Sequence, residues 1–190
     1  MSRQYVEDKI IEERNGHQQP LQQGDYEGCA FIQCDLSEND LSGFHFYDCR
    51  FEQCNLSNAQ LHQTLLRNCT FINCKLLGVH FEQCNPFLFE VKFEQCVLQY
   101  ASFYQMKMKN TGFIHCNLME ADFTEADLSH ASFAESNLAL ATFDQTNLQH
   151  ADFRTAMNYT INPTANNIKK AKFSWPALLG LLGGMDIEVE

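Results

Sequence analysis

Nine cysteines and seven histidines are the residues of this sequence that could bind a metal ion or form disulfides. The cysteines, however, all occupy one position of a five-residue repeat where alanine is the most frequent other residue, which indicates that they are small core residues. Cysteines on adjacent strands would lie about 4.8 Å apart, whereas a disulfide requires Cβ atoms about 3.8 Å apart. We therefore expect free thiols and no metal site, which suits a reducing cytoplasm.

Histidines and carboxylates offer no catalytic constellation either. His130 and His150 are twenty residues apart and are expected to stack on the surface, but the sequence suggests no third ligand. The carboxylates fall on outward positions of a convex surface, which provides no pocket that could shift a pKa. The sequence contains no Gly-rich phosphate loop and no nucleophile motif. We expect no catalytic residue, no cofactor and no small-molecule substrate.

A five-residue period organises most of the chain. A large apolar residue, here called position i, recurs from Leu21 to Phe81 and, after a slip of two residues, resumes at Leu88 and continues to Phe153. Small residues occupy position i−2, and mainly polar residues occupy the other three positions. This period matches neither an amphipathic helix nor a flat strand, so five residues must form one side and one corner of a coil.

A second period, of twenty residues, sets four sides in each coil. Phenylalanine recurs at every fourth position i, and leucine recurs at the next position i along the chain. Like residues would then stack along the axis at the spacing of adjacent strands, about 4.8 Å, as internal ladders. The predicted fold is an all-β, four-sided β-helix. Its core ladder comprises Phe31, Phe51, Phe71, Phe93, Phe113, Phe133, Phe153 and Phe173.

The tandem motif Ala-(Asp/Asn)-(Leu/Phe)-X-X, present at residues 121–125 and 126–130, resembles the signature of the pentapeptide-repeat family. The resemblance implies a right-handed quadrilateral β-helix. The layout is most similar to the quinolone-resistance and microcin-immunity members, the Qnr, MfpA and McbG types. Those members form head-to-head dimers whose acidic rods resemble duplex DNA and bind DNA gyrase or topoisomerase IV. The resemblance therefore implies a homodimer and a type II topoisomerase as partner.

The charge distribution is the most informative surface feature. With 24 acidic and 13 basic residues, the chain has a net charge of −11, so nucleic acid is not an expected ligand. Residues 110–153 contain no Lys or Arg. This acidic half could imitate DNA, or it could simply keep a β-rich rod soluble. Its candidate partner-binding residues are Glu120, Asp122, Glu125, Asp127, Glu135, Asp144 and Asp152.

The two ends divide the chain into a cap segment at residues 1–20, the β-helix at 21–173 and a helix with a terminal strand at 174–190. Ser174-Trp175-Pro176 predicts a helix start, and Gly183-Gly184 predicts its end. We expect Trp175, Leu178, Leu179 and Leu182 to share one helical stripe, with Leu181 off it. This much apolar surface favours a homodimer interface over a simple plug. The candidate interface is Trp175, Leu178, Leu179, Leu181, Leu182, Ile187 and Val189.

The slip near residues 85–89 permits two interpretations. Pro86, Phe87 and Phe89, together with Leu77, Val97 and Tyr100, could form an outward apolar patch for a partner. Alternatively, the extra residues form a bulge that buries them locally, which is the more common outcome and the one that we expect.

Two functional hypotheses follow. The first is a non-catalytic DNA mimic that binds a type II topoisomerase and shields it from a quinolone or a toxin. The second is a protein-interaction scaffold with an unrelated target. No apolar run reaches the length of a membrane span, so the expected location is the cytoplasm.

Overall fold

The five-residue repeat folds into a wall segment followed by a corner. Side chains at i and i−2 point inward, and the residue at i+2 adopts a left-handed backbone that turns the chain by one corner. Consecutive corners at Glu120, Glu125, His130 and Glu135 have φ values of 56°, 58°, 62° and 53°. Four such corners return the chain to its starting side, one strand spacing further along the axis.

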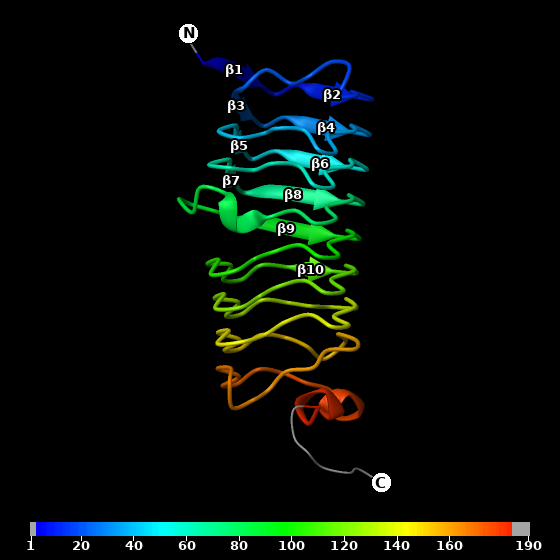
Figure 1. The fold of residues 1–190 in the computed structure, drawn as a ribbon, viewed down its shortest axis with the longest axis vertical. Coiled ribbons are helices and arrows are strands. Elements are labelled where there is room, and N and C mark those ends of the chain that lie inside the picture. The colour runs from blue at the N-terminus through cyan, green and yellow to red at the C-terminus, as the bar shows by residue number, and fades with distance from the viewer. Residues whose placement is uncertain (1–2, 184–190) are drawn as a thin grey trace.

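The computed structural model describes residues 3–183, and it is a parallel β-solenoid of stacked four-sided coils (Figure 1). The predicted fold is therefore confirmed. Within these residues every strand pairing is parallel, and the strands form two sheets, in the orders β1-β3-β5-β7 and β10-β9-β8-β6-β4-β2. The strands are β1 (Gln4–Glu7), β2 (Ile10–Glu12), β3 (Gly24–Glu27), β4 (Ala30–Ile32), β5 (His45–Tyr47), β6 (Arg50–Glu52), β7 (Leu65–Arg67), β8 (Cys69–Ile72), β9 (Val91–Glu94) and β10 (Phe113–Ile114).

The other two sides pair through single bridges. One such column runs through eight successive coils, and it comprises Asn15, Asp35, Asn55, Lys75, Val97, Asn117, Asn137 and Met157. We name each side after one of its central residues. The Leu128 side carries the first sheet and the Phe31 side carries the second, and between them around each coil lie the Leu36 side and the Phe123 side.

The core is built from two aromatic ladders on opposite sides. On the Phe31 side, successive phenylalanine rings stack with centroids 4.7–5.4 Å apart. On the Phe123 side, a second ladder begins at Phe81 and continues through Phe103 and Phe123 to Phe143 at 4.9–5.1 Å. The two ladders meet edge to face, as between Phe113 and Phe123 at 5.7 Å.

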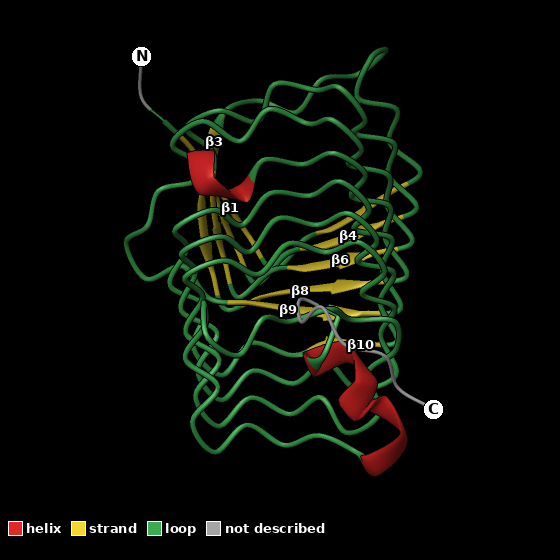
Figure 2. Ribbon diagram, turned by 60° about the horizontal axis from the view of Figure 1, so that its bottom comes forward, coloured by secondary structure: helices red, strands yellow, loops and turns green. Residues whose placement is uncertain are grey.

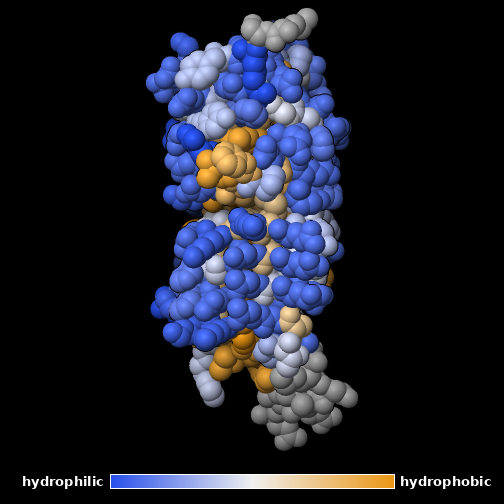
Figure 3. Space-filling model, turned by 90° about the vertical axis from the view of Figure 1, so that its left-hand side faces the viewer, coloured by the Kyte–Doolittle hydropathy of each residue, from blue (hydrophilic) through white to orange (hydrophobic). Residues whose placement is uncertain are grey.

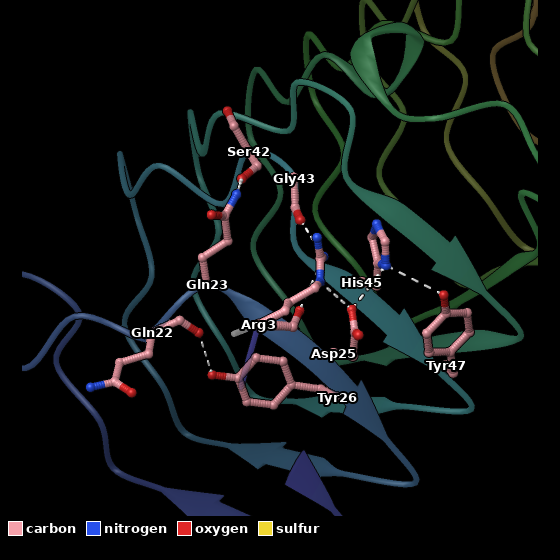
Figure 4. Close-up of polar contacts among 10 residues, drawn as sticks. Arg3, Gln22, Gln23, Asp25, Tyr26, Ser42, Gly43, His45 and Tyr47 are labelled. Atoms are coloured by element: carbon pink, nitrogen blue, oxygen red, sulfur yellow. Dashed lines mark hydrogen bonds and ion pairs between the residues drawn. The ribbon is translucent and has the colours of Figure 1, made fainter. Parts of the chain in front are cut away.

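Residues 4–12, within the segment expected to cap the amino-terminal end, form strands on two sides of the first coil of the solenoid. β1 pairs with β3 and β2 pairs with β4, each at an interval of twenty residues. Arg3 bonds the Asp25 carboxylate and the Gly43 carbonyl, and Asp25 also contacts His45 Nδ1 at 2.9 Å (Figure 4). These contacts tie the first coil to the two coils below it.

The frame slip is a four-residue bulge on the Leu128 side. Asn85 N–H donates to Thr64 C=O at 2.8 Å, and Glu90 N–H donates to Leu66 C=O at 3.0 Å. By the register of the parallel strands, Asn85 is thus the partner of Leu65 and Glu90 is the partner of Arg67, so residues 86–89 lie opposite Leu66 alone. The short 3₁₀ helix η1 (Phe81–Gln83) precedes the bulge.

The expected role of Leu88 as a central core residue was wrong. Leu88 is 54% exposed and has a φ of 55°, whereas Phe89 packs against the core. The bulge also leaves Phe87 67% exposed, so it does not bury all of its extra residues as we expected. The five-residue pattern does not predict which side chains of the bulge face the core, because the chain leaves the regular wall there.

The carboxy-terminal end carries the 3₁₀ helix η2 (Trp175–Leu181), which lies beside the last coil (Figure 2). Ala177 and Leu181 pack against the core, while Trp175 and Leu179 are 86% and 57% exposed. The predicted stripe was thus wrong in phase, because Leu181 faces the core and Trp175 does not. A 3₁₀ helix has three residues per turn, so an α-helical phase does not apply. Ile187 and Val189 lie outside the described residues.

Candidate functional site

Four of the seven candidate acids gather on the Phe123 side and its two corners. Asp122 and Asp144 flank the central residues of adjacent coils on this side, and Glu120 and Glu125 occupy the corners that bound it. The Glu125 N–H donates to the Asp144 C=O at 2.8 Å, which places these two residues on neighbouring rungs. We call Glu120, Asp122, Glu125 and Asp144 the acidic side.

These carboxylates differ in how much hydrogen bonding they already make. Asp122 accepts from the Thr124 N–H at 2.9 Å, so it also stabilises its own turn. Glu125 accepts from Gln105 Nε2 at 2.8 Å on the preceding coil. Glu120 and Asp144 are exposed, and within residues 3–183 their carboxylates accept no hydrogen bond from the protein. Their oxygens are therefore available to a partner.

Asp127 lies on the adjoining Leu128 side. Its Oδ1 accepts from the Ser129 N–H at 3.0 Å and from Asn147 Nδ2 at 2.8 Å. Because both bonds hold the wall together, this carboxylate has a structural role and only borders the acidic side.

Glu135 and Asp152 lie on the opposite, Phe31 side of the rod. His115 Nδ1 lies 3.3 Å from the Glu135 carboxylate, and Arg154 Nη2 lies 2.7 Å from the Asp152 carboxylate. The Arg154 hydrogen bonds hold the pKa of Asp152 below its ordinary value. The structure thus separates these two acids from the acidic side, and both have a basic neighbour.

Exposed apolar side chains lie near the acidic side, and the sequence analysis did not assign them to this surface. Tyr100 and Leu140 occupy the same corner column as Glu120, one coil before and one coil after it, and they are 51% and 74% exposed. Tyr104, on the Phe123 side, is 38% exposed. The signal was a large apolar residue at position i+2 for Tyr100 and Leu140, and at position i+1 for Tyr104, where the repeat otherwise carries mainly polar residues.

The cysteines and histidines form no metal centre in the part of the chain that the structure describes, where no group of three potential ligands comes together. All nine cysteines are buried free thiols, and Cys54 Sγ, for example, lies 3.3 Å from the Phe31 carbonyl oxygen. His130 and His150 stack at 4.6 Å between centroids. Desolvation, and then the charge of His130, lower the pKa of His150.

Among residues 3–183, no helix combines the length and the apolar character that a membrane crossing requires.

These features define a class of protein: a repeat solenoid with a filled core, whose outward columns supply its chemistry. Models of the pentapeptide repeat region match residues 25–85, 44–113 and 106–180. The chain therefore belongs to the pentapeptide-repeat family.

Solved structures agree with this assignment at the level of the fold. A trypsin-treated variant of QnrB1, a plasmid-mediated fluoroquinolone resistance protein, aligns with a TM-score of 0.66 and 16% identity over 99% of this chain and 98% of its own. Full-length QnrB1 aligns with a TM-score of 0.60 and 17% identity over 97% of this chain and 100% of its own. A comparison with curated protein sequences gave no match.

Proposed function

We propose that this protein acts without catalysis as a partial mimic of duplex DNA, binds a type II topoisomerase through the acidic side, and protects the enzyme from a quinolone or a toxin. The observation that carries the proposal is the clustering of Glu120, Asp122, Glu125 and Asp144 on one side, in a region without Lys or Arg. Such a surface attracts a basic protein groove that is built to hold DNA.

The choice of enzyme draws on the likeness to QnrB1, which is a fluoroquinolone resistance protein. Charge density limits the mimicry. Eight coils at about 4.8 Å span about 38 Å, over which duplex DNA would carry about 22 charges at one per 1.7 Å. The chain has a net charge of −11, so we expect it to compete with DNA without matching its affinity for the enzyme.

The proposal includes a homodimer through the carboxy-terminal end. Trp175 and Leu179 are exposed on η2, and apolar surface of this kind at the end of a rod suits contact with a second copy. Two rods joined at this end would bring their acidic halves together in the middle of the dimer.

A scaffold for an unrelated protein is the second candidate. Tyr100, Tyr104 and Leu140 favour it, because they add apolar contact area that DNA mimicry does not require. A topoisomerase assay distinguishes the two candidates.

The test is gyrase supercoiling with purified protein, with and without a fluoroquinolone, across a salt series. We expect inhibition or drug protection that weakens as salt rises, because exposed charge pairs are screened. No effect at micromolar protein would contradict topoisomerase binding and leave the scaffold candidate.

The matched variants are Glu120→Lys, Glu125→Lys and Asp144→Lys together, against a control on the Phe31 side with Glu52→Lys, Glu94→Lys and Glu135→Lys. Both triples change the net charge equally. We expect only the first to weaken gyrase binding, by about tenfold or more. Equal loss in both triples would show that total charge, and not the acidic side, determines binding.

A further inference from the structure

The bulge at residues 86–89 presents apolar side chains outward from an otherwise polar surface. Phe89 anchors it, since its ring lies 6.3 Å from that of Phe81 in the core. Phe87 and Leu88 are 67% and 54% exposed. Figure 3 shows an apolar patch surrounded by hydrophilic residues on this face of the rod. The packing of Phe89 against the core thus keeps the side chains of Phe87 and Leu88 exposed.

Two hollows lie beside the bulge. The first has a volume of about 450 Å³. Its lining includes Leu88, Phe89, one arginine and three lysines. The second has a volume of about 360 Å³ and is lined by Pro86, Phe87, Phe89, Gln105, Met106 and Lys107. We call the two hollows with the bulge between them the bulge groove.

The first hollow concentrates positive charge on an acidic protein. Arg67, Lys92, Lys107 and Lys109 line it with one acid, Glu90, so four positive charges and one negative charge leave a net of +3. The whole chain has a net charge of −11. Lys107 and Lys109 occupy outward positions on the Leu128 side and Lys92 occupies one on the adjoining Phe31 side, so the fold itself brings them around the bulge.

Most of these cations lack an internal partner. Arg67 lies 3.7 Å from the Asp48 carboxylate, and its guanidinium is 4.8 Å from the centroid of the Tyr47 ring. Within residues 3–183, no carboxylate lies within 4.0 Å of the amino group of Lys92, Lys107 or Lys109. Three like charges at one site are most readily stabilised by an anion from another molecule.

We propose that the bulge groove binds an acidic segment of a partner protein that carries a large apolar side chain. The carboxylates of the segment would face Lys92, Lys107 and Lys109, and the apolar side chain would pack on Phe87 and Leu88. The combination is selective, because a segment that supplies only charge leaves the apolar bulge in water.

The surroundings favour a short acidic peptide over a nucleic acid. Asp127 is the backbone β-bridge partner of Lys107 on the next coil of the same side, and Asp48 lies beside Arg67 at the opposite end. A long polyanion would therefore meet like charge as soon as it left the groove. A peptide of a few residues can end within it.

The proposal goes beyond the topoisomerase hypothesis and does not depend on it, because it concerns another side of the rod. The test is selection of random heptapeptides displayed on phage against the full chain, followed by anisotropy measurements with a labelled synthetic copy of the most enriched peptide. We expect the enriched peptides to combine Asp or Glu with Phe, Leu or Ile. No enrichment, or enrichment without excess acid, would overturn the proposal.

Two variants locate the binding. Lys92→Glu, Lys107→Glu and Lys109→Glu together are expected to weaken peptide binding at least tenfold, and Phe87→Ser with Leu88→Ser to weaken it about tenfold. Because these side chains are exposed, we expect each variant to fold, and circular dichroism is the control for this. The Glu120→Lys, Glu125→Lys, Asp144→Lys variant is expected to bind the peptide as well as or better than the wild type. Unchanged binding in both groove variants would overturn the proposal.

Other anions are tested as competitors. A single-stranded dodecanucleotide and phosphatidylglycerol vesicles are expected to displace the peptide only at concentrations at least tenfold above the peptide's own Kd. If either displaced it more effectively than the unlabelled peptide, the groove would be an anion or membrane site, and the protein-segment proposal would be wrong.

Discussion

The phenylalanine at the centre of each wall segment makes contact both along the axis and across the core. Phe113 is fully buried, and its ring stacks on Phe93 and Phe133 at 5.3 and 5.1 Å. It also meets Phe103 and Phe123 edge to face. A single side chain in this position therefore joins three coils and two sides.

Replacing Phe113 with alanine should be among the most destabilising changes in the protein. We expect a loss of about 3–5 kcal/mol in the free energy of unfolding, from lost burial and an unfilled cavity. Urea denaturation monitored by circular dichroism measures it. Phe173→Ala is the control, because Phe173 is only partly buried and stacks on one phenylalanine. An equal loss at both positions would contradict the account.

The buried thiols should make stability fall in alkaline solution. Burial raises the pKa of Cys49 to about 12, whereas a thiol in an unfolded chain has a pKa of about 8.5. Between these values the unfolded chain releases a proton that the folded chain retains, so the free energy of unfolding decreases as pH rises. Urea titrations between pH 8 and 10.5 test this, with Cys49→Ala expected to flatten the slope. A stability that rises over this range would refute it.

Residue roles inside the core followed well from sequence, and those at the surface did not. The position of Cys49 and of Phe113 within its own five-residue repeat determines which way each side chain points, because each repeat has two inward positions, i and i−2. No such rule distinguishes Glu125 from Glu135. Both are exposed corner glutamates, and only the order of sides around the coil shows that they lie at diagonally opposite corners.

At the scale of elements, η2 depends on a close approach to the last coil. The Ile161 N–H donates to the Gly180 C=O at 2.8 Å. A Cβ atom on Gly180 would lie 2.3 Å from the Tyr159 carbonyl oxygen, which is closer than any real contact. The glycine therefore permits the helix to dock.

Gly180→Ala should destabilise this end by about 1–3 kcal/mol through overpacking. Thermal unfolding followed by the fluorescence of Trp175, the single tryptophan, measures the effect. The matched control is Gly112→Ala, where the added Cβ would meet only the Ile114 side chain, at ordinary distances of 3.8 and 3.9 Å. Equal thermal midpoints for the two variants would show that η2 is not docked as described.

Both elements that interrupt the repeat were located by the sequence, but their orientation was not predicted. The bulge forms where the five-residue frame slips, yet its inward side chain is Phe89 and not Leu88. η2 is a 3₁₀ helix with three residues per turn, so its buried side chains do not follow the spacing expected for an α-helix. In each case tertiary packing, which has no local signature, selected the buried side chain.

At the scale of the whole molecule, the proposed dimer makes a sharp prediction. Trp175→Glu with Leu179→Glu should halve the mass measured by light scattering, because two charges would then be buried in the interface. Leu140→Glu is the control, since it changes an equally exposed apolar side chain elsewhere on the rod. A wild-type protein that is already monomeric would contradict the dimer.

The regular stacking also makes the rod a molecular ruler. Each coil advances the axis by about 4.8 Å, so any two residues in one column are separated by a whole number of coils. The bulge groove and the acidic side lie on adjoining sides, and Asp127, one coil beyond Lys107 of the groove, borders the acidic side. Inserting one twenty-residue coil between Thr111 and Glu120 would move two bound partners apart by one increment without removing a residue from either binding surface. The number of coils between two binding surfaces therefore determines the distance between their bound partners along the axis.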